Sequence, residues 1–439
     1  MNRNRVIRCA WIFWAVLVSA FFVGTAVAHD LTPIERLGKF IFFDKNLSIN
    51  RNQSCAACHA PQVGWTGPEA ALNKGGAVYE GSIAGRFGNR KPPSSAYATL
   101  SPILHYQMQD GEAVFIGGNF WDGRATGERL GNPAADQAQG PFLNPLEQAL
   151  PDSACVVYRV CTANYPVSFQ GVWGAGACDI EWPADVETVC ATEGGMVELS
   201  DDDRAKSETA YDNIALSIAA YEDSFKVNAF TSKFDYYLAG KVRLTVWEKW
   251  GLRLFTTKGK CANCHTLDPA GPDGEPLFTD FTYDNLGVPR NPHNPFYNEP
   301  TFNPDGKDWV DEGLGGFLAT RSDYKMYAEE NYGKQKVPTV RNVDKRPSKR
   351  FVKAYGHNGY FKSLWGIVHF YNTRDVKPVC PDPFTTEAKA LCQGCWPEPE
   401  VAANVNTDEL GNLGLNTWEE IAIVAFLKTL SDGYQPSWR

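Results

Sequence analysis

A five-residue motif, C-x-x-C-H, occurs twice in this chain of 439 residues. In such a motif two thiols add across the vinyl groups of haem, and the neighbouring histidine becomes a ligand of the iron. Chance or a structural disulfide could explain one copy, and a zinc site would need two further ligands that neither copy has at similar spacing. Two copies therefore predict two covalently bound haem c groups, held by Cys55, Cys58 and His59 and by Cys261, Cys264 and His265.

The pattern T-x-x-E-x-x-G-x-x-x-F precedes both motifs, starting at Thr32 and at Thr245. Its Thr–Glu pair is a capping box, which predicts that a helix begins at each site. We interpret the repeat as an internal duplication, with coincidence between two capping boxes as the alternative. The chain would then consist of two cytochrome c-like haem domains, an N-terminal one at residues 29–240 and a C-terminal one at residues 241–439.

The remaining patterns predict a mainly α protein with long irregular loops. Ser200 caps an apolar periodicity that runs through residues 211–219, and Thr417 to Glu420 cap a last helix that reaches Leu430. Alternating strand patterns are scarce. Residues 268–316 and 377–412 are irregular, and residues 152–200 contain four cysteines with Gly and Pro, which is typical of a disulfide-tied insertion.

The N-terminus predicts export from the cytoplasm. Three arginines precede an uncharged run that ends in Ala26-Val27-Ala28, which is typical of a signal peptide over residues 1–28. An uncleaved membrane anchor is the alternative. Cleavage would leave no transmembrane span and a periplasmic or cell-surface protein. Loss of the three arginines changes the net charge from −9 to −12; this acidic balance disfavours nucleic acid and favours a basic partner, or serves solubility alone.

Twelve cysteines are present, of which Cys9 lies in the predicted signal peptide and four belong to the haem motifs. In an oxidising compartment the other seven should pair mostly as disulfides, with one left free or paired between chains. Cys392 and Cys395 have the haem spacing, but Trp396 replaces the histidine, so no third haem is predicted. The seven are Cys155, Cys161, Cys178, Cys190, Cys380, Cys392 and Cys395.

Several linked motifs resemble one protein family. F-W-D-G-R at 120–124, Q-A-Q-G-P at 137–141 and N-P-L-E at 144–147 are similar to the peroxidatic half of bacterial dihaem cytochrome c peroxidases and the related MauG proteins. V-P-T-V-R-N-V at 337–343 and H-N-G at 357–359 are similar to their electron-transfer half. The resemblance covers about residues 31–151 and 205–439 and leaves the cysteine-rich insertion outside.

The resemblance implies a site that cleaves H2O2. This chemistry needs an open iron position and a group that moves a proton from one peroxide oxygen to the other. The family's distal glutamate and glutamine match Glu147 and Gln137, and Pro141 would form a wall of the same pocket. Trp121 matches a tryptophan that relays electrons between the haems. The structural alternatives are that Glu147 is a solvated loop acid, that Gln137 is a surface amide and that Trp121 only packs in the core.

The resemblance also points to unusual axial ligands. The peroxidases close the first haem with a histidine that follows C-x-x-C-H, but residues 60–104 contain none and His105 lies outside the matching segment. We infer that the His59 haem is open at rest. At the second haem the methionine position holds Tyr371, as in MauG proteins, with Met326 and His369 as alternatives. A phenolate ligand stabilises ferric iron and should lower the potential.

Three functions remain open at this point. The first is an extracytoplasmic dihaem peroxidase that reduces H2O2 with electrons passed through the C-terminal haem from a small cytochrome or copper protein. The second is MauG-like oxidation of Trp or Tyr residues on a protein substrate. The third is a non-catalytic electron carrier, which Glu147 argues against. The family also implies Ca²⁺ between the haems, bound through the Val352 and Ala354 backbone, but its Asn ligand falls near Tyr97.

Overall fold

Helices joined by long loops make up most of the structure, a computed structural model that describes residues 30–109 and 111–436. The prediction of a mainly α class is confirmed, because the strands of this part are short and form two two-stranded antiparallel sheets, β1 with β2 and β3 with β4. The predicted signal peptide lies outside the described residues.

The strands are β1 His105–Gln109, β2 Glu112–Ile116, β3 Tyr283–Asp284 and β4 Gln335–Lys336. The α-helices are α1 Pro33–Phe43, α2 Cys55–Cys58, α3 Ala70–Lys74, α4 Pro133–Leu143, α5 Ser153–Thr162, α6 Phe169–Trp173, α7 Val186–Cys190, α8 Asp201–Asp223, α9 Lys233–Leu238, α10 Val246–Phe255, α11 Gly313–Ala319, α12 Leu364–Thr373, α13 Glu387–Gln393 and α14 Thr417–Leu427.

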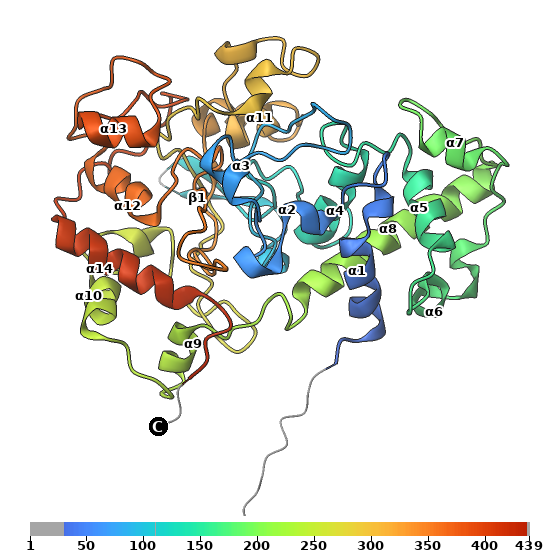
Figure 1. The fold of residues 1–439 in the computed structure, drawn as a ribbon, viewed down its shortest axis with the longest axis horizontal. Helices are drawn as coiled ribbons and strands as arrows, with labels where there is room; N and C mark the ends of the chain where they lie inside the picture. The colour runs from blue at the N-terminus through green and yellow to red at the C-terminus, as the bar shows by residue number, and fades with distance from the viewer. Residues whose placement is uncertain (1–29, 110, 437–439) are drawn as a thin grey trace, which may run out of the picture. The chain divides into compact units, whose positions relative to one another are not determined.

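Two helix crossings frame the two motif regions (Figure 1). Helix α1 packs on α8, and α10 packs on α14. A Cβ atom on Gly38 of α1 would lie 1.7 Å from the Ser217 carbonyl oxygen, and one on Gly251 of α10 would lie 1.8 Å from that of Ala422. The glycine of the repeated pattern is therefore required at both crossings, because only a residue without Cβ allows the two backbones to approach so closely.

The predicted helix starts are confirmed at three sites and shifted at a fourth. Thr32 and Thr245 each form a capping box with the glutamate three residues on, and the Ser200 side chain accepts from the Asp203 backbone N–H. The cap of the last helix is Asn416 rather than Thr417, and α14 ends at Leu427 before a short 3-10 turn. Asn416 has the better side-chain oxygen for the first backbone N–H groups, and Glu419 completes its capping box.

The close crossing of α10 and α14 leads to a stability prediction. Gly251→Ala should force the helices apart and destabilise the fold by about 1–3 kcal/mol, as overpacking does. Thermal unfolding followed by circular dichroism should therefore show a clearly lower midpoint. Gly176→Ala is the matched control, because a Cβ there meets no atom within 4 Å. Equal midpoints for the two variants would contradict the packing argument.

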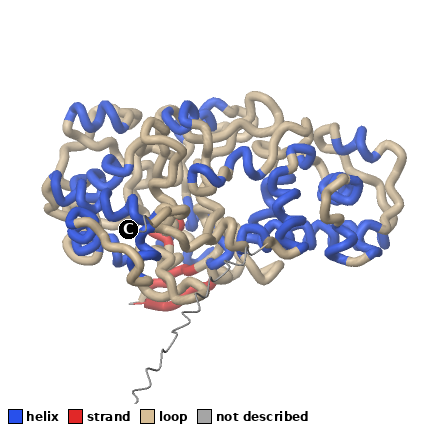
Figure 2. Tube along the Cα trace, turned by 60° about the horizontal axis from the view of Figure 1, so that its bottom comes forward, coloured by secondary structure: helices blue, strands red, loops and turns tan. Residues whose placement is uncertain are grey.

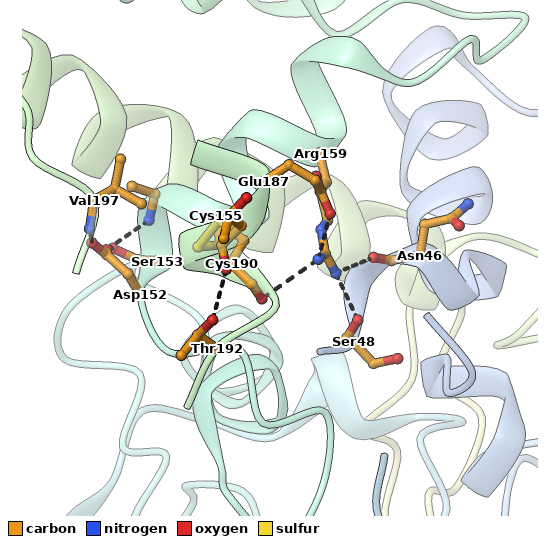
Figure 3. The surroundings of a disulfide bond; sticks show 12 residues. Asn46, Ser48, Asp152, Ser153, Cys155, Arg159, Glu187, Cys190, Thr192 and Val197 are labelled. Atoms are coloured by element: carbon orange, nitrogen blue, oxygen red, sulfur yellow. Dashed lines mark hydrogen bonds and ion pairs between the residues drawn. A yellow bond between two sulfur atoms is a disulfide. The ribbon is translucent and has the colours of Figure 1, made fainter. Parts of the chain in front are cut away.

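The cysteine-rich insertion contains the two disulfides Cys155–Cys190 and Cys161–Cys178, as a disulfide-tied segment should. Beside the first of them, the buried Arg159 guanidinium donates to the carbonyl oxygens of Asn46 and Ser48, at 2.8 and 2.6 Å (Figure 3). These bonds tie α5 to the segment that precedes the first haem motif. The insertion is therefore anchored to the region it interrupts.

A third disulfide joins Cys380 to Cys395 and leaves Cys392 as an exposed free thiol. Since Cys395 is already paired, residues 392–396 are not a third haem motif, as predicted. The irregular stretch at 377–412 does contain one helix, α13, which sequence reasoning missed. Within the described part of the chain, no helix is long and apolar enough to cross a membrane.

Loops occupy the middle of the molecule between the helical regions (Figure 2). Residues from Thr32 onward belong to one compact unit. The proposed division at residue 240, and the duplication behind it, stay predictions. The loops matter for function because most of the cavity wall described next comes from them.

Candidate functional site

Both C-x-x-C-H motifs line one internal cavity of about 450 Å³. The first follows α1 and forms the short helix α2, and the second forms a 3-10 turn after α10. In each motif the histidine backbone N–H donates to the carbonyl of the first cysteine, at 3.0 Å for His59 and 2.9 Å for His265. The same local turn thus brings two thiols and one imidazole to the cavity wall twice.

Each motif histidine is oriented by a backbone carbonyl. His59 Nδ1 lies 3.2 Å from the Trp65 oxygen, and His265 Nδ1 lies 3.0 Å from the Phe278 oxygen. Burial lowers the pKa of His59 to about 4 and also lowers the pKa of His265. A neutral ring that donates through Nδ1 keeps the Nε2 lone pair free, which is the arrangement that an iron ligand needs.

The four motif cysteines are free and half-buried, whereas six other cysteines form disulfides. Burial raises the pKa of Cys55 and of Cys261 to about 12, and it raises the pKa of the other two motif thiols as well. They therefore stay protonated in an apolar wall and available for attachment. Two thiols and one imidazole per motif are the donor set that a haem c group uses.

The residues of the predicted peroxide pocket all line this cavity. Gln137 and Pro141 lie four residues apart on α4 and so share one helix face, and Glu147 lies in the loop after it. The Asn144 side chain donates to Glu147 Oε1 at 2.8 Å, and the Ser82 backbone N–H donates to the Glu147 carbonyl at 2.6 Å. The glutamate is therefore held from both its side chain and its backbone.

Burial raises the pKa of Glu147, and the Arg124 charge and the Asn144 hydrogen bond oppose this shift. Arg124 was not singled out from the sequence. Its guanidinium lies 3.7 Å from the centre of the Phe120 ring and pairs with Asp122 at 2.8 Å. A carboxyl group with a raised pKa beside a positive charge can both accept and return a proton.

Trp121 is buried in the cavity wall. Its indole Nε1–H donates to the Lys91 carbonyl at 2.9 Å, and its ring meets that of His357 edge-on at 6.5 Å between centroids. The indole is thus fixed within the wall that the two motifs share.

The three candidates for the second axial ligand are placed very differently. Tyr371 of α12 lines the cavity together with His265, and burial raises the pKa of its phenol. His369 lies elsewhere, stacked on Trp365 at 4.8 Å, with Nδ1 2.8 Å from a Glu420 oxygen. Met326 is 76% exposed. Of these three, Tyr371 alone shares the cavity with the second motif.

The histidines that line the cavity, in the part of the chain that the structure describes, are His59, His265 and His357. His357 Nε2 lies 3.4 Å from Glu400 Oε2 and 4.0 Å from Asp311 Oδ2, so this ring is engaged with carboxylates. His105 is exposed on β1, with Nδ1 2.9 Å from the Ile103 oxygen. No further described histidine therefore faces the cavity as a candidate distal ligand.

Besides the exposed Lys260, three lysines that sequence reasoning missed also line the cavity: Lys91, Lys336 and Lys353. No described carboxylate forms an ion pair with any of them, and burial lowers the pKa of Lys91 to about 8 and of Lys336 to about 7. An ammonium group in such a place requires an anion, and haem carries propionate carboxylates. No sequence signal distinguishes these lysines from surface ones.

Of the two residues predicted to bind calcium through their carbonyls, one is hydrogen-bonded to a side chain and the other lines the cavity. The Val352 oxygen accepts a hydrogen bond from Asn73 Nδ2 at 3.1 Å, while Ala354 lines the cavity. Tyr97, near which the expected Asn falls, donates its hydroxyl to Asp432 at 2.7 Å.

Comparisons with known proteins agree with this geometry. Residues 33–243 match the family model for di-haem cytochrome c peroxidase. Methylamine utilization protein MauG of Paracoccus denitrificans is 33% identical, over 96% of this chain and 95% of that protein. Cytochrome-c peroxidase IdrP1 of Denitromonas iodatirespirans is 24% identical, over 90% of this chain and 80% of that protein.

Among solved structures, the diheme peroxidase BthA from Burkholderia thailandensis matches with a TM-score of 0.69 and 26% identity. The match covers 92% of this chain and 87% of that one. The two thiol–imidazole motifs in one cavity and these similarities lead to the same assignment. The chain is a haem oxidoreductase that belongs to the dihaem cytochrome c peroxidase and MauG family.

Proposed function

We propose that this protein is an exported dihaem c-type peroxidase that reduces H2O2 at the His59 site, with electrons supplied through the His265 site. The observation that carries the proposal is Glu147, a half-buried acid held by Asn144 in the cavity that contains the first motif. A pure electron carrier has no use for such a group. When bound, the haem iron supplies the electrons that cleave the O–O bond.

The protein groups would then handle protons and orientation. Reduction of one H2O2 to two H2O consumes two electrons and two protons. Glu147 takes the proton from one peroxide oxygen and returns it to the other, which becomes the leaving water. The Gln137 amide orients the peroxide, Pro141 limits the pocket, and Trp121 relays electrons across the shared wall.

The two haem groups are proposed to attach covalently through Cys55 and Cys58 and through Cys261 and Cys264. This attachment accords with an exported protein in the periplasm or at the cell surface. A small cytochrome or a copper protein would deliver the electrons, and the acidic net charge of the chain favours a basic surface on that donor.

A second function is supported by a separate observation. Tyr371 lines the cavity at the second motif, and the MauG protein of Paracoccus denitrificans is 33% identical to this chain. A phenolate ligand would make the second site hard to reduce and favour oxidised states. The oxidising equivalents of H2O2 could then pass outward to Trp or Tyr residues on a partner protein.

One experiment distinguishes these functions. The fully oxidised holo-protein is mixed with one equivalent of H2O2, either alone or with a reduced small c-type cytochrome. Peroxide loss coupled to cytochrome oxidation supports the peroxidase. Peroxide loss without cytochrome oxidation, but with oxidation of a Trp-containing test protein, supports the MauG-like function. If no peroxide is consumed under either condition, both enzymatic proposals fail.

The same experiment tests the open first site. Because no further described histidine faces the cavity, the oxidised protein should react with H2O2 without prior reduction. A reaction that requires half-reduction would show that a ligand must first leave the iron.

Asn144→Ala should change the pH dependence of peroxide consumption. The Asn144 hydrogen bond lowers the pKa of Glu147, so its loss should raise that pKa further. Glu147 accepts a proton only when it is deprotonated, and the acidic limb of the pH–rate profile should therefore move to higher pH. Initial rates measured between pH 4 and 8 would show this shift. An unchanged acidic limb would mean that Glu147 is not the base.

A further inference from the structure

The ammonium group of Lys353 lies in a cage of backbone carbonyls. Its Nζ lies 2.9 Å from the Val63 oxygen, 3.0 Å from that of Asn342 and 3.1 Å from that of Lys345. The side chain is 5% exposed. Several convergent carbonyl oxygens form the kind of ligand set that hard cations prefer, and here the cation is part of the chain.

Lys91 is a second buried cation on the same cavity. It is 8% exposed, and its Nζ lies 2.9 Å from the Pro92 oxygen and 3.1 Å from Thr66 Oγ1. Its own carbonyl accepts the Trp121 indole N–H. Lys91 and Lys353 together carry two positive charges when protonated, which equals the charge of one divalent metal ion.

The cage of Lys353 joins segments that are far apart in the sequence. Val63 follows the first haem motif, whereas Asn342 belongs to the V-P-T-V-R-N-V segment of the second half and Lys345 follows it. Gly64 permits the close approach, because a Cβ there would lie 2.8 Å from that of Asn342. The ammonium group therefore ties the first motif's loop to the second half of the chain.

The residues that would bind a metal do not fit one. The Val352 carbonyl already accepts a hydrogen bond from the Asn73 amide, which also donates to the Gly67 oxygen at 3.0 Å. The expected Asn falls near Tyr97, whose hydroxyl is bonded to Asp432. A metal near Lys91 and Lys353 would also be repelled by both ammonium groups.

We propose that Lys91 and Lys353 take the place of the Ca²⁺ that the family implies between its haem groups, and that this protein requires no metal ion there. The haem propionates are the anions that would balance the two ammonium groups. These two lysines belong to the chain itself, so the proposal does not depend on whether the protein acts as a peroxidase or oxidises a partner protein.

Metal content tests the proposal directly. Holo-protein purified in the presence of CaCl2 and then dialysed should contain substoichiometric calcium by plasma mass spectrometry. Its thermal midpoint and haem reduction potentials should not change when EGTA is added. One tightly bound calcium per chain, or an EGTA-dependent fall in the midpoint, would overturn the proposal whatever the peroxidase activity is.

The variant Lys353→Met tests the role of the charge. Loss of a positive charge near haem favours the ferric state, so at least one reduction potential should fall relative to wild type, with haem content retained. Lys362→Met is the matched control, because Lys362 Nζ also bonds to carbonyls, of Gly75 and Gly359, but does not line the cavity. Equal potentials in both variants would contradict the proposal. If Lys353→Met does not fold, the calcium measurement on wild-type protein still decides.

Discussion

Glu147→Gln should lower the rate of H2O2 consumption by about 10²–10⁴-fold, the usual contribution of a positioned acid–base group. The substitution keeps the shape of the side chain, and its amide oxygen can still accept from Asn144 Nδ2. It removes the titratable group that moves the proton between the peroxide oxygens. Stopped-flow measurement of peroxide loss, at saturating electron donor and fixed pH, gives the comparison.

The Glu147→Gln substitution should lower the rate of the reaction without affecting folding or haem binding. Haem content and thermal midpoint should stay close to wild type, because burial raises the pKa of Glu147 and so already disfavours its charged form. Glu299→Gln is the matched control: Glu299 is buried and accepts from the Phe87 backbone N–H at 3.0 Å, but it lies outside the cavity. A peroxide rate for Glu147→Gln within a few fold of this control would contradict the assignment.

The carboxylate role can be separated from a simple loss of hydrogen bonding. Glu147→Asp keeps the acid but moves it back by one methylene, so it should recover part of the rate that Gln loses. If Asp and Gln variants are equally slow, geometry rather than proton transfer limits the reaction. The two variants therefore distinguish the acid–base role from a purely structural one.

Local sequence signals predicted the parts of the fold that depend on neighbouring residues. The capping boxes at Thr32 and Thr245 define helix starts because the side chain and the backbone groups it bonds lie within four residues. The glycine in the same pattern had no assigned role in the sequence, and the structure explains it through the crossings at Ser217 and Ala422. The pattern thus determines both where a helix begins and where a second helix can cross it closely.

Features that depend on distant segments could not be predicted in this way. The carbonyl cage of Lys353 uses residues that are between 8 and 290 positions away along the chain. The disulfide pairing of Cys155 with Cys190 could not be predicted from the sequence either, because seven cysteines allow many pairings. Placement of Gln137 and Pro141 on one face could be expected once α4 was recognised, but their position on the shared cavity required the fold.

Tyr371→Met should raise the reduction potential of the second haem, by roughly 0.1–0.3 V within the range that axial ligands span. A phenolate is a hard anion that stabilises ferric iron, whereas a thioether favours the ferrous state. Met can occupy the space of the tyrosine, which packs at the edge of the apolar core around Phe370 and Phe361. Spectroelectrochemical titration of the holo-protein would resolve the change.

Controls decide among the three candidate ligands. Tyr360→Phe removes a buried hydroxyl that donates to the Thr385 carbonyl outside the cavity, and it should leave both potentials unchanged. His369→Asn should also have little effect, because the His369 ring is bonded to Glu420 away from the cavity. Met326→Leu alters a side chain that is 76% exposed and should change neither potential.

The reduction potentials also determine whether the proposed enzyme takes electrons from a small cytochrome or oxidises a partner protein. If Tyr371→Met raises the second potential, the variant should accept electrons from a small cytochrome more readily, and its cytochrome oxidation rate should increase relative to wild type. Oxidation of a partner protein's Trp or Tyr should decline, because a higher potential for the ferric–ferrous couple disfavours the oxidised states that such chemistry needs. If His369→Asn or Met326→Leu shifts the potential instead, Tyr371 is not the ligand. The direction of electron flow would then have to be argued from another residue.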